Sequence, residues 1–229
     1  MDVKTIAKET VKQLSEGMSE KEIKLLEETL VKNYEPIFKE MTAQKKIPIN
    51  DNTIDALIKA KGAGLSSTEK EKARTMLKDV CVEGKSPAES MELNKSILDW
   101  SYMNAYKQYQ TGNFNEAIPT LRVLEWLDPS RFEFGFALAA CYQMSKDYEN
   151  AIFCYMKLAV NFPENPLPLF HAADCFKQKK LHNVAFATLQ EVIKRCGEDP
   201  RYSKIKEKSQ LFSDVEKELT NQNIQTKVV

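Results

Sequence analysis

The chain has 229 residues, of which 42% are hydrophobic and 29% are charged, and its 33 basic side chains are balanced by 33 acidic ones. This balance disfavours a nucleic-acid-binding protein, which needs a basic face to neutralise phosphate, and it equally disfavours a polybasic membrane anchor. The length is enough for one large or two small domains with a sizeable core.

The distribution of apolar residues predicts a protein without a signal peptide or a membrane span, located in the cytoplasm. Residues 1–12 are polar and charged, and the longest apolar run, residues 134–142, is much shorter than the roughly 18 residues that a membrane helix needs. The five cysteines form no CxxC pair. Their spacing favours reduced thiols that pack as small apolar residues over a disulfide framework or a zinc site.

The apolar pattern predicts an all-helical protein, because apolar residues recur at spacings of three and four and strand-like alternation is absent. In residues 1–83, a helix with an apolar stripe that includes Ile23, Leu26 and Leu30 is expected, with Pro36 kinking or breaking it. Residues 45–52 indicate a loop, and residues 52–61 a short helix. Three serines followed at the third position by glutamate predict capping boxes, in the pairs Ser19 with Glu22, Ser66 with Glu69, and Ser86 with Glu89.

A step of 34 residues organises the middle of the chain. Two antiparallel helices with their turns occupy 34 residues, and small alanines suit the places where paired helices approach most closely. This is the tetratricopeptide pattern, here in three repeats; the alternative is an ordinary helical bundle with chance alanine spacing. The step is clearest in two alanine series, Ala105, Ala139 and Ala173, and Ala117, Ala151 and Ala185.

The repeats suggest three parts of the chain. Residues 1–83 form a helical amino-terminal extension, residues 84–197 a three-repeat domain with its leading helix, and residues 198–229 a carboxy-terminal capping helix with a frayed tail. A solenoid needs a cap at its open end. The stripe expected to provide it consists of Ile205, Phe212, Val215 and Leu219.

The repeat positions that face the concave side of the solenoid, here called the inward slots, are the candidate peptide-binding site. In such a solenoid the first helix of each pair lines the concave side, where extended peptides bind. Tyrosines there offer a large contact area together with a hydroxyl for backbone groups, so an extended, partly hydrophobic peptide is the expected ligand. The alternative is that these aromatics belong to the core. The candidate residues are Tyr102, Tyr106, Tyr109, Phe136, Ala140, Gln143, Phe170 and Asp174.

The same slots disfavour a site that clamps a terminal carboxylate, since Lys177 is their only base and Asp99, Glu133 and Asp174 accompany it. An enzymatic function is also disfavoured, because no phosphate loop, dinucleotide fingerprint, GxSxG or HExxH is present. His171 and Cys175 lie four residues apart and could hold half a metal site, but no second pair follows at zinc spacing. The sequence therefore predicts no catalytic residues, no metal and no cofactor.

Three stretches resemble the class II chaperones of bacterial type III secretion, the SycD/LcrH family. They are YKQYQTGNFNEA at residues 106–117, LRVLEWLDPSRFEFGFALAACYQMSKDYENAIFCY at residues 121–155, and PLFHAADCFKQKKL at residues 168–181. The likeness covers about residues 84–196. It implies a cytoplasmic three-repeat solenoid that holds hydrophobic, pore-forming translocators before export, through an extended PxLxxP-like segment in the concave groove.

The resemblance also bears on individual residues. The groove aromatics of the family's first repeat match Tyr102, Tyr106 and Tyr109. The family's short amino-terminal arm contributes to dimerisation, but residues 1–83 are much longer here. This region could extend the solenoid, mediate self-association, or bind a second client or the export gate. Self-association as a homodimer is favoured, because the apolar stripe of Ile23, Leu26 and Leu30 must be covered. The resulting hypothesis is an export chaperone that binds neither nucleic acid nor the membrane stably. Its alternatives are a general tetratricopeptide adaptor, a structural part of the secretion apparatus, and an enzyme.

Overall fold

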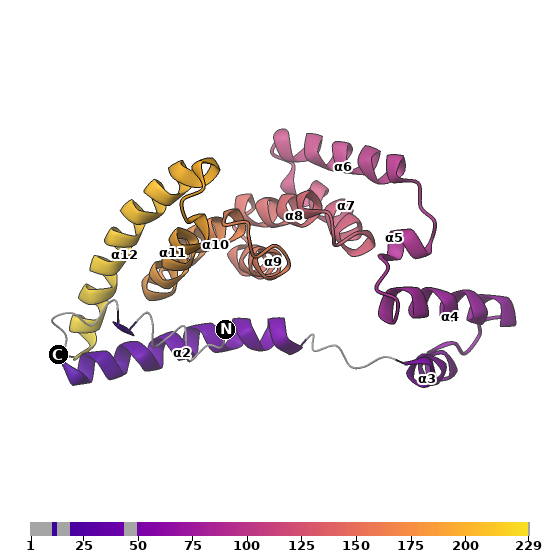
Figure 1. The fold of residues 1–229 in the computed structure, drawn as a ribbon, viewed down its shortest axis with the longest axis horizontal. Coiled ribbons are helices and arrows are strands. Elements are labelled where there is room, and N and C mark those ends of the chain that lie inside the picture. The colour runs from indigo at the N-terminus through magenta and orange to yellow at the C-terminus, as the bar shows by residue number, and fades with distance from the viewer. Residues whose placement is uncertain (1–10, 13–18, 44–49, 229) are drawn as a thin grey trace. The chain divides into compact units, whose positions relative to one another are not determined.

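The structure is a computed structural model that describes residues 11–12, 19–43 and 50–228. Over these residues the chain is helical and contains no strand, as predicted (Figure 1). None of the helices in this part of the chain is long and apolar enough to cross a membrane. The chain divides into two compact units. We call residues 45–141 the repeat-1 unit, and residues 1–44 with 142–229 the repeat-3 unit.

The repeat-1 unit begins with three helices, α3 (Asp51–Lys61), α4 (Ser67–Cys81) and the short α5 (Pro87–Ser90). The first helix pair of the repeats follows as α6 (Lys95–Gln110) and α7 (Phe114–Leu127), which pack against each other. Helix α8 (Phe132–Met144) starts in this unit and ends in the other.

The repeat-3 unit contains α9 (Tyr148–Asn161), α10 (Leu167–Gln178) and α11 (His182–Cys196), with α10 packed between its two neighbours in the chain. A short 3-10 helix, η1 (Pro200–Tyr202), leads into the long α12 (Ser203–Val228). Helix α2 (Glu20–Ala43) also belongs to this unit and packs on α9, α11 and α12.

All three predicted capping boxes are present. They open α2, α4 and α5, and in each the serine N–H donates to the glutamate carboxylate at 2.7–2.8 Å. The glutamate N–H donates back to the serine hydroxyl at 3.2–3.4 Å. These hydrogen bonds favour the ionised carboxylate and lower the pKa of Glu22, Glu69 and Glu89. The helix starts are therefore set locally, by four-residue stretches of sequence.

The alanines at the 34-residue step are buried, as the repeat predicts. The six side chains are at most 2% exposed. The turn between the two helices of a repeat also recurs, because Gly112, Lys146 and Lys180 are 34 residues apart and have φ of 80°, 65° and 59°. A left-handed residue at this place satisfies the last carbonyls of the first helix, and only glycine adopts it without steric cost.

Of the kink or break expected at Pro36, the break is absent, since α2 continues past this residue to Ala43. Leu26 and Leu30 are 1% and 0% exposed, and Ile23 is half-buried. Because α2 contacts α11 and α12, the apolar stripe is covered by the same chain. The loop expected at residues 45–52 falls mostly outside the described residues.

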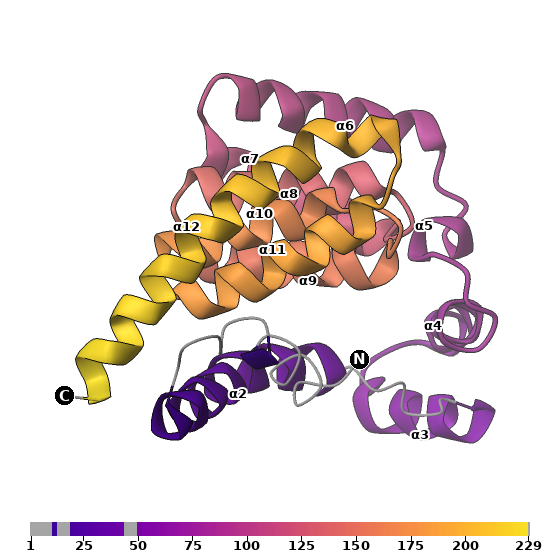
Figure 2. The same cartoon turned by 60° about the vertical axis from the view of Figure 1, so that its left-hand side comes forward.

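The predicted packing face of α12 is wrong for two of its four residues. Ile205 and Leu219 are half-buried. Phe212 and Val215 are 37% and 48% exposed. Helix α12 lies along α11 (Figure 2). Its buried face is instead a mainly polar stripe at helical spacing. The small hydroxyl residues allow a close approach of the two helices, and a search for apolar periodicity does not detect them. The buried stripe consists of Ser209, Ser213, Glu216, Thr220 and Ile224.

Three of the four polar side chains of this stripe have a hydrogen-bond partner among the described residues, and the buried Ser209 hydroxyl has none. Glu216 is 1% exposed, and its Oε2 lies 2.7 Å from Nδ1 of His182 at the start of α11. Gln190 Nε2 donates to Ser213 Oγ at 2.5 Å, and Thr220 Oγ1 donates to the Glu216 carbonyl at 2.7 Å. The Thr220 bond lies within α12. Because a buried polar group is costly when it lacks a partner, the other two bonds, from Glu216 to His182 and from Ser213 to Gln190, determine how α12 sits on α11.

We therefore expect Glu216→Ala to destabilise the protein by about 3 kcal/mol, because it leaves His182 without its buried partner. Urea unfolding followed by circular dichroism measures this loss. Glu218→Ala is the matched control, since Glu218 is exposed on the same helix. Equal stability of the two variants would show that the pair does not hold α12.

A second prediction concerns the alanine step. Ala151 is 0% exposed, so Ala151→Leu forces a larger side chain into a closed contact and should cost about 1–3 kcal/mol of unfolding free energy. Ala56→Leu, at an exposed position of α3, serves as the control and should leave the midpoint of urea unfolding nearly unchanged. A wild-type midpoint for Ala151→Leu would contradict close packing at the repeat alanines.

Candidate peptide-binding site

A ladder of three tyrosines follows one face of α6. Tyr102, Tyr106 and Tyr109 are spaced by four and three residues, which places them on the same side of the helix. The rings of Tyr102 and Tyr106 lie 6.0 Å apart at 26°, and those of Tyr106 and Tyr109 lie 6.0 Å apart at 23°. We call these three residues the tyrosine ladder.

The tyrosine ladder lies at the surface. Tyr106 is 37% exposed and the other two tyrosines are half-buried, whereas the fully buried residues of α6 are Leu98 and Ala105. The ladder is held at both ends, because Tyr102 contacts the ring of Phe134 at 5.4 Å and Tyr109 contacts that of Phe114 at 5.6 Å. An apolar surface with fixed ring positions is thus open to a ligand.

The hydroxyls at the two ends of the ladder, those of Tyr102 and Tyr109, keep their protons. Burial raises the pKa of Tyr102, with the negative charge of Glu133 as a further cause, and burial also raises the pKa of Tyr109. At neutral pH both phenols are therefore hydrogen-bond donors, which suits the backbone carbonyls of a peptide.

Arg131 fixes the start of α8 against α6. Its Nη1 lies 2.5 Å from Asp99 Oδ1, its Nε donates to Glu133 Oε1 at 2.7 Å, and its Cζ lies 4.2 Å from the centre of the Phe134 ring. Burial alone would lower the pKa of Arg131, but the hydrogen bonds to the two carboxylates outweigh it and raise the pKa. Two of the three acidic side chains predicted on inward slots, Asp99 and Glu133, are thus paired with a residue that sequence reasoning did not consider.

Phe136 and Ala140 lie one helical turn apart on α8 and are both half-buried. The Phe136 ring stacks on that of Phe132, 5.2 Å away at 25°. These two candidates and the tyrosine ladder belong to the repeat-1 unit.

The remaining three candidates come together in the repeat-3 unit. Gln143, Phe170 and Asp174 line one pocket of about 230 Å³, which we call the third-repeat pocket. Gln143 Nε2 donates to Asp174 Oδ2 at 2.9 Å. Phe212 of α12 also lines the pocket, with its ring 6.3 Å from that of Phe170. Sequence reasoning assigned Phe212 to the packing face of α12 and so missed it.

The polar groups of this pocket form a chain of contacts. The Tyr155 hydroxyl donates to Gln143 Oε1 at 2.9 Å, and the Lys177 ammonium lies 3.0 Å from Asp174 Oδ1. The same ammonium lies 4.9 Å from the centre of the Phe212 ring. The one base among the inward slots is therefore engaged within its own repeat, which argues against a carboxylate clamp.

His171 and Cys175 are accounted for by packing. The imidazole stacks on Tyr155 at 5.4 Å and meets Phe170 edge-on at 5.8 Å, and burial lowers its pKa. Cys175 is 0% exposed, and burial raises the pKa of its thiol to about 12. Within the described ranges no three histidine, cysteine or acidic side chains gather as a metal site would require.

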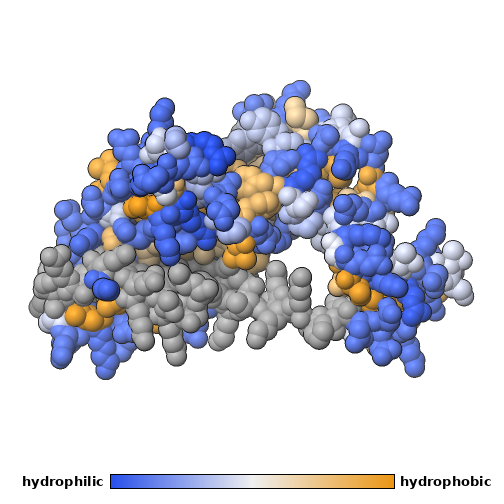
Figure 3. Space-filling view, in the orientation of Figure 1, coloured by the Kyte–Doolittle hydropathy of each residue, from blue (hydrophilic) through white to orange (hydrophobic). Residues whose placement is uncertain are grey.

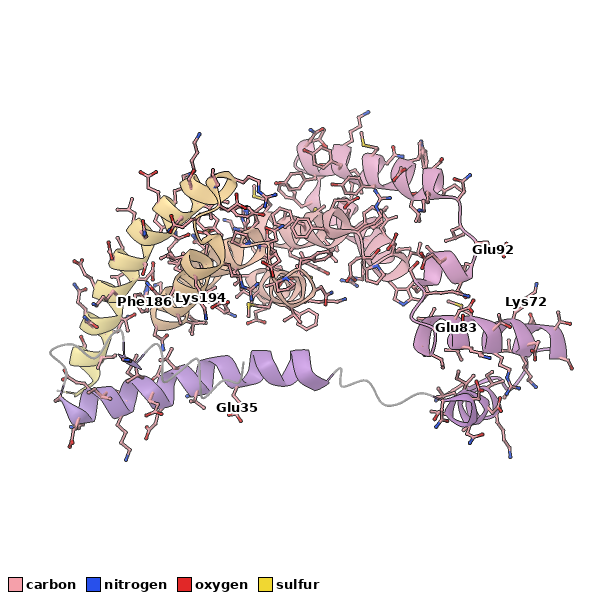
Figure 4. The ribbon with its side chains drawn as sticks, in the orientation of Figure 1. Glu35, Lys72, Glu83, Glu92, Phe186 and Lys194 are labelled. Atoms are coloured by element: carbon pink, nitrogen blue, oxygen red, sulfur yellow. The ribbon has the colours of Figure 1, made fainter. Side chains whose placement is uncertain are left out.

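Other apolar side chains are exposed singly or in short rows. The face seen in Figure 3 is mainly hydrophilic, with scattered hydrophobic positions. On α11, hydrophobic Phe186 is 3% exposed, whereas charged Lys194 is exposed to solvent; both are labelled in Figure 4. Among the residues whose side chains the structure describes, the most exposed aromatic one is Trp100 on α6, at 70%.

Known proteins resemble the chain in sequence. Residues 135–165 match the profile of the tetratricopeptide repeat family. Low calcium response locus protein H of Yersinia pestis is 34% identical over 88 residues, which are 38% of this chain and 52% of that protein. The chain therefore spans about half the length of the curated relatives that it matches.

Solved structures resemble it in fold. The translocator chaperone SycD of Yersinia enterocolitica is 27% identical with a TM-score of 0.54, over 58% of this chain and 98% of SycD. SycD in complex with a peptide of the translocator YopD is 28% identical with a TM-score of 0.52, over 55% of this chain and 96% of that one.

These likenesses, with the helix pairs and buried alanines described above, identify a tetratricopeptide-repeat protein. Within that class, the predicted resemblance to the class II chaperones of type III secretion, the SycD/LcrH family, is confirmed in both sequence and fold. The division at residues 84 and 197 and the roles of the eight candidate residues stay predictions.

Proposed function

We propose that this chain is a type III secretion chaperone of the bacterial cytoplasm. It binds hydrophobic, pore-forming translocator proteins through an extended segment and keeps them soluble and competent for export. The observation that carries this proposal is the tyrosine ladder, an ordered aromatic surface that is not consumed by the core. The solved complex of SycD with a peptide of YopD supports it.

The mechanism requires only binding. A translocator has apolar segments that would aggregate or insert prematurely if left exposed in water. The ladder offers ring faces to the side chains of such a segment and phenol donors to its carbonyls, while its own rings are already ordered, so little entropy is lost on binding. The proposed function uses no nucleotide, metal or cofactor, includes no catalytic step, and needs neither nucleic acid nor insertion into the membrane.

Truncation of the ladder tests the proposal. Tyr102→Ala, Tyr106→Ala and Phe136→Ala should each weaken client binding by about 1–3 kcal/mol if these rings are anchors. The probes are overlapping peptides that cover the pore-forming translocators of the same organism, and calorimetry measures their affinity.

Trp100→Ala is the matched control, since it removes a large exposed ring from another side of α6. Circular dichroism checks that helicity is kept. Wild-type affinity in the triple variant would exclude this surface as the site, and capture of a soluble, non-exported protein instead would favour a general adaptor.

Self-association through residues 1–83 is a further part of the proposal, supported by the solved alternative dimer of SycD. The apolar stripe of α2 no longer argues for it, because Leu26 and Leu30 are buried in the same chain. Leu57 and Leu65, at 42% and 41% exposed, offer apolar contacts in this region. Light scattering should show a lower mass for the Leu57→Glu, Leu65→Glu variant than for the wild type, and an unchanged mass would contradict such an interface.

A further inference from the structure

We propose that a pocket between α2, α11 and α12 binds a small aliphatic carboxylate, the class to which fatty acids belong, and that the start of α11 holds the carboxylate group. Leu26 of α2, Lys180 before α11 and Ile224 of α12 are among its lining residues, and we call it the α2 pocket. Its volume of about 610 Å³ is in the range of small-molecule sites. It shares no lining residue with the tyrosine ladder or the third-repeat pocket, so the inference is independent of translocator binding.

The 34-residue step shows what the start of α11 lacks. In the preceding repeat, Asp147 stands before α9, and its Oδ1 accepts a hydrogen bond from the Asn150 N–H at 3.3 Å. The equivalent residue before α11 is Leu181, whose side chain makes no such bond. The first N–H groups of a helix have no acceptor within the helix, and with the helix dipole they attract an anion. A ligand carboxylate can therefore take at α11 the place that the Asp147 carboxylate takes at α9.

Asn183 is a second and independent indication of a ligand. This residue lines the α2 pocket and is 8% exposed. Its Nδ2 nevertheless makes no hydrogen bond in the part of the chain that the structure describes. A buried N–H group without an acceptor is costly. Because Asn183 is the second residue of α11, its amide lies at the same helix end as the N–H groups of the first turn, and a carboxylate with two oxygens can accept from both.

The charges of the lining favour an anion. Lys180, in the turn before α11, and Lys32 of α2 both line the pocket and are exposed. His182 also lines it but is bound to Glu216 at 2.7 Å. Glu28 is the acidic residue of the described lining. Two ammonium groups and the start of α11 thus attract a single carboxylate against the repulsion of one acid, whereas a cation would meet the opposite balance.

The rest of the wall suits an aliphatic chain. Leu25 and Leu26 of α2, Leu181 before α11 and Ile224 of α12 all line the pocket. Leu26 and Ile224 are 1% and 6% exposed, and the other two leucines are half-buried. A simple ion such as acetate fills only a small part of this volume and leaves the leucines without contact. An aliphatic chain attached to the carboxylate buries apolar surface against them, so the body of the ligand contributes to the affinity.

A first experiment tests the ligand class. The full chain is titrated with octanoate, and methyl NMR follows Leu25, Leu181 and Ile224. We expect saturable shifts of these methyl groups. Octanamide has the same body without the charge, and acetate has the head group without the body, so each should bind about tenfold more weakly or worse. No saturable shift with octanoate, or equal affinity for octanoate and octanamide, would overturn the proposal.

A second experiment tests the residues that hold the carboxylate. Lys180→Gln and Asn183→Ala should each weaken octanoate binding about fivefold or more. Lys146→Gln is the matched control, because Lys146 is an exposed lysine at the same repeat position, with φ of 65° against 59° for Lys180. Circular dichroism checks the fold. Wild-type affinity in both variants, or an equal loss in the control, would contradict a site at the start of α11.

The repeat offers a third variant. Leu181→Asp supplies at α11 the carboxylate that Asp147 supplies at α9, so it should lower octanoate affinity about tenfold or more, whereas Leu181→Met should retain it. The melting temperature shows whether each variant is folded. Undiminished octanoate binding by folded Leu181→Asp would show that the ligand does not occupy the helix start.

The tyrosine ladder must be excluded as the place where octanoate binds. Tyr106→Ala should leave the octanoate affinity and the shifts of Leu25, Leu181 and Ile224 unchanged, because the ladder does not line the α2 pocket. Loss of these shifts in Tyr106→Ala would refute the α2 pocket as the site. Failure of translocator peptides to bind, with the octanoate shifts retained, would refute the proposed client and leave the α2 pocket supported.

Discussion

The close approach of paired helices at small side chains is the constraint on which the other features depend. Six alanines at a 34-residue step are at most 2% exposed, and each marks a place where the fold has no room for a larger side chain. With these contacts closed by alanine, the larger residues of the same helices are displaced to other faces. The tyrosine ladder of α6 is one result, since Ala105 packs inward and the neighbouring tyrosines line the surface.

Much of this could be predicted from the sequence, because the responsible interactions are either local or periodic. A capping box such as Ser66 with Glu69 involves residues three apart and was found from its letters alone. The repeat alanines were found because the same slot recurs three times. The exposure of the tyrosine ladder was predicted from the same 34-residue repeat, because other positions of the repeat, such as that of Ala105, were assigned to the interior. The possible break at Pro36 was wrong, because local propensity disfavours proline inside a helix, yet α2 continues past it to Ala43.

The packing of α12 could not be predicted in this way, because polar and small residues carry it. Apolar periodicity pointed to Phe212 and Val215, while Ser213 and Glu216 form the buried face. What makes a buried glutamate acceptable is its partner His182, 34 positions earlier in the chain, and a single sequence does not show that pairing. The ion pair of Arg131 with Asp99 was missed for the same reason. Sequence reasoning thus placed residues on faces but could not say which polar groups meet.

The polar face of α12 has a consequence for the alignment of the helix. Apolar surfaces tolerate sliding, because contact between them has no direction, whereas a buried carboxylate is satisfied only where its acceptor atoms meet a partner. If α12 shifted by one turn along α11, Glu216 would leave His182 and Ser213 would leave Gln190. The helix is therefore restricted to a single register, and that register holds the Phe212 ring opposite Phe170.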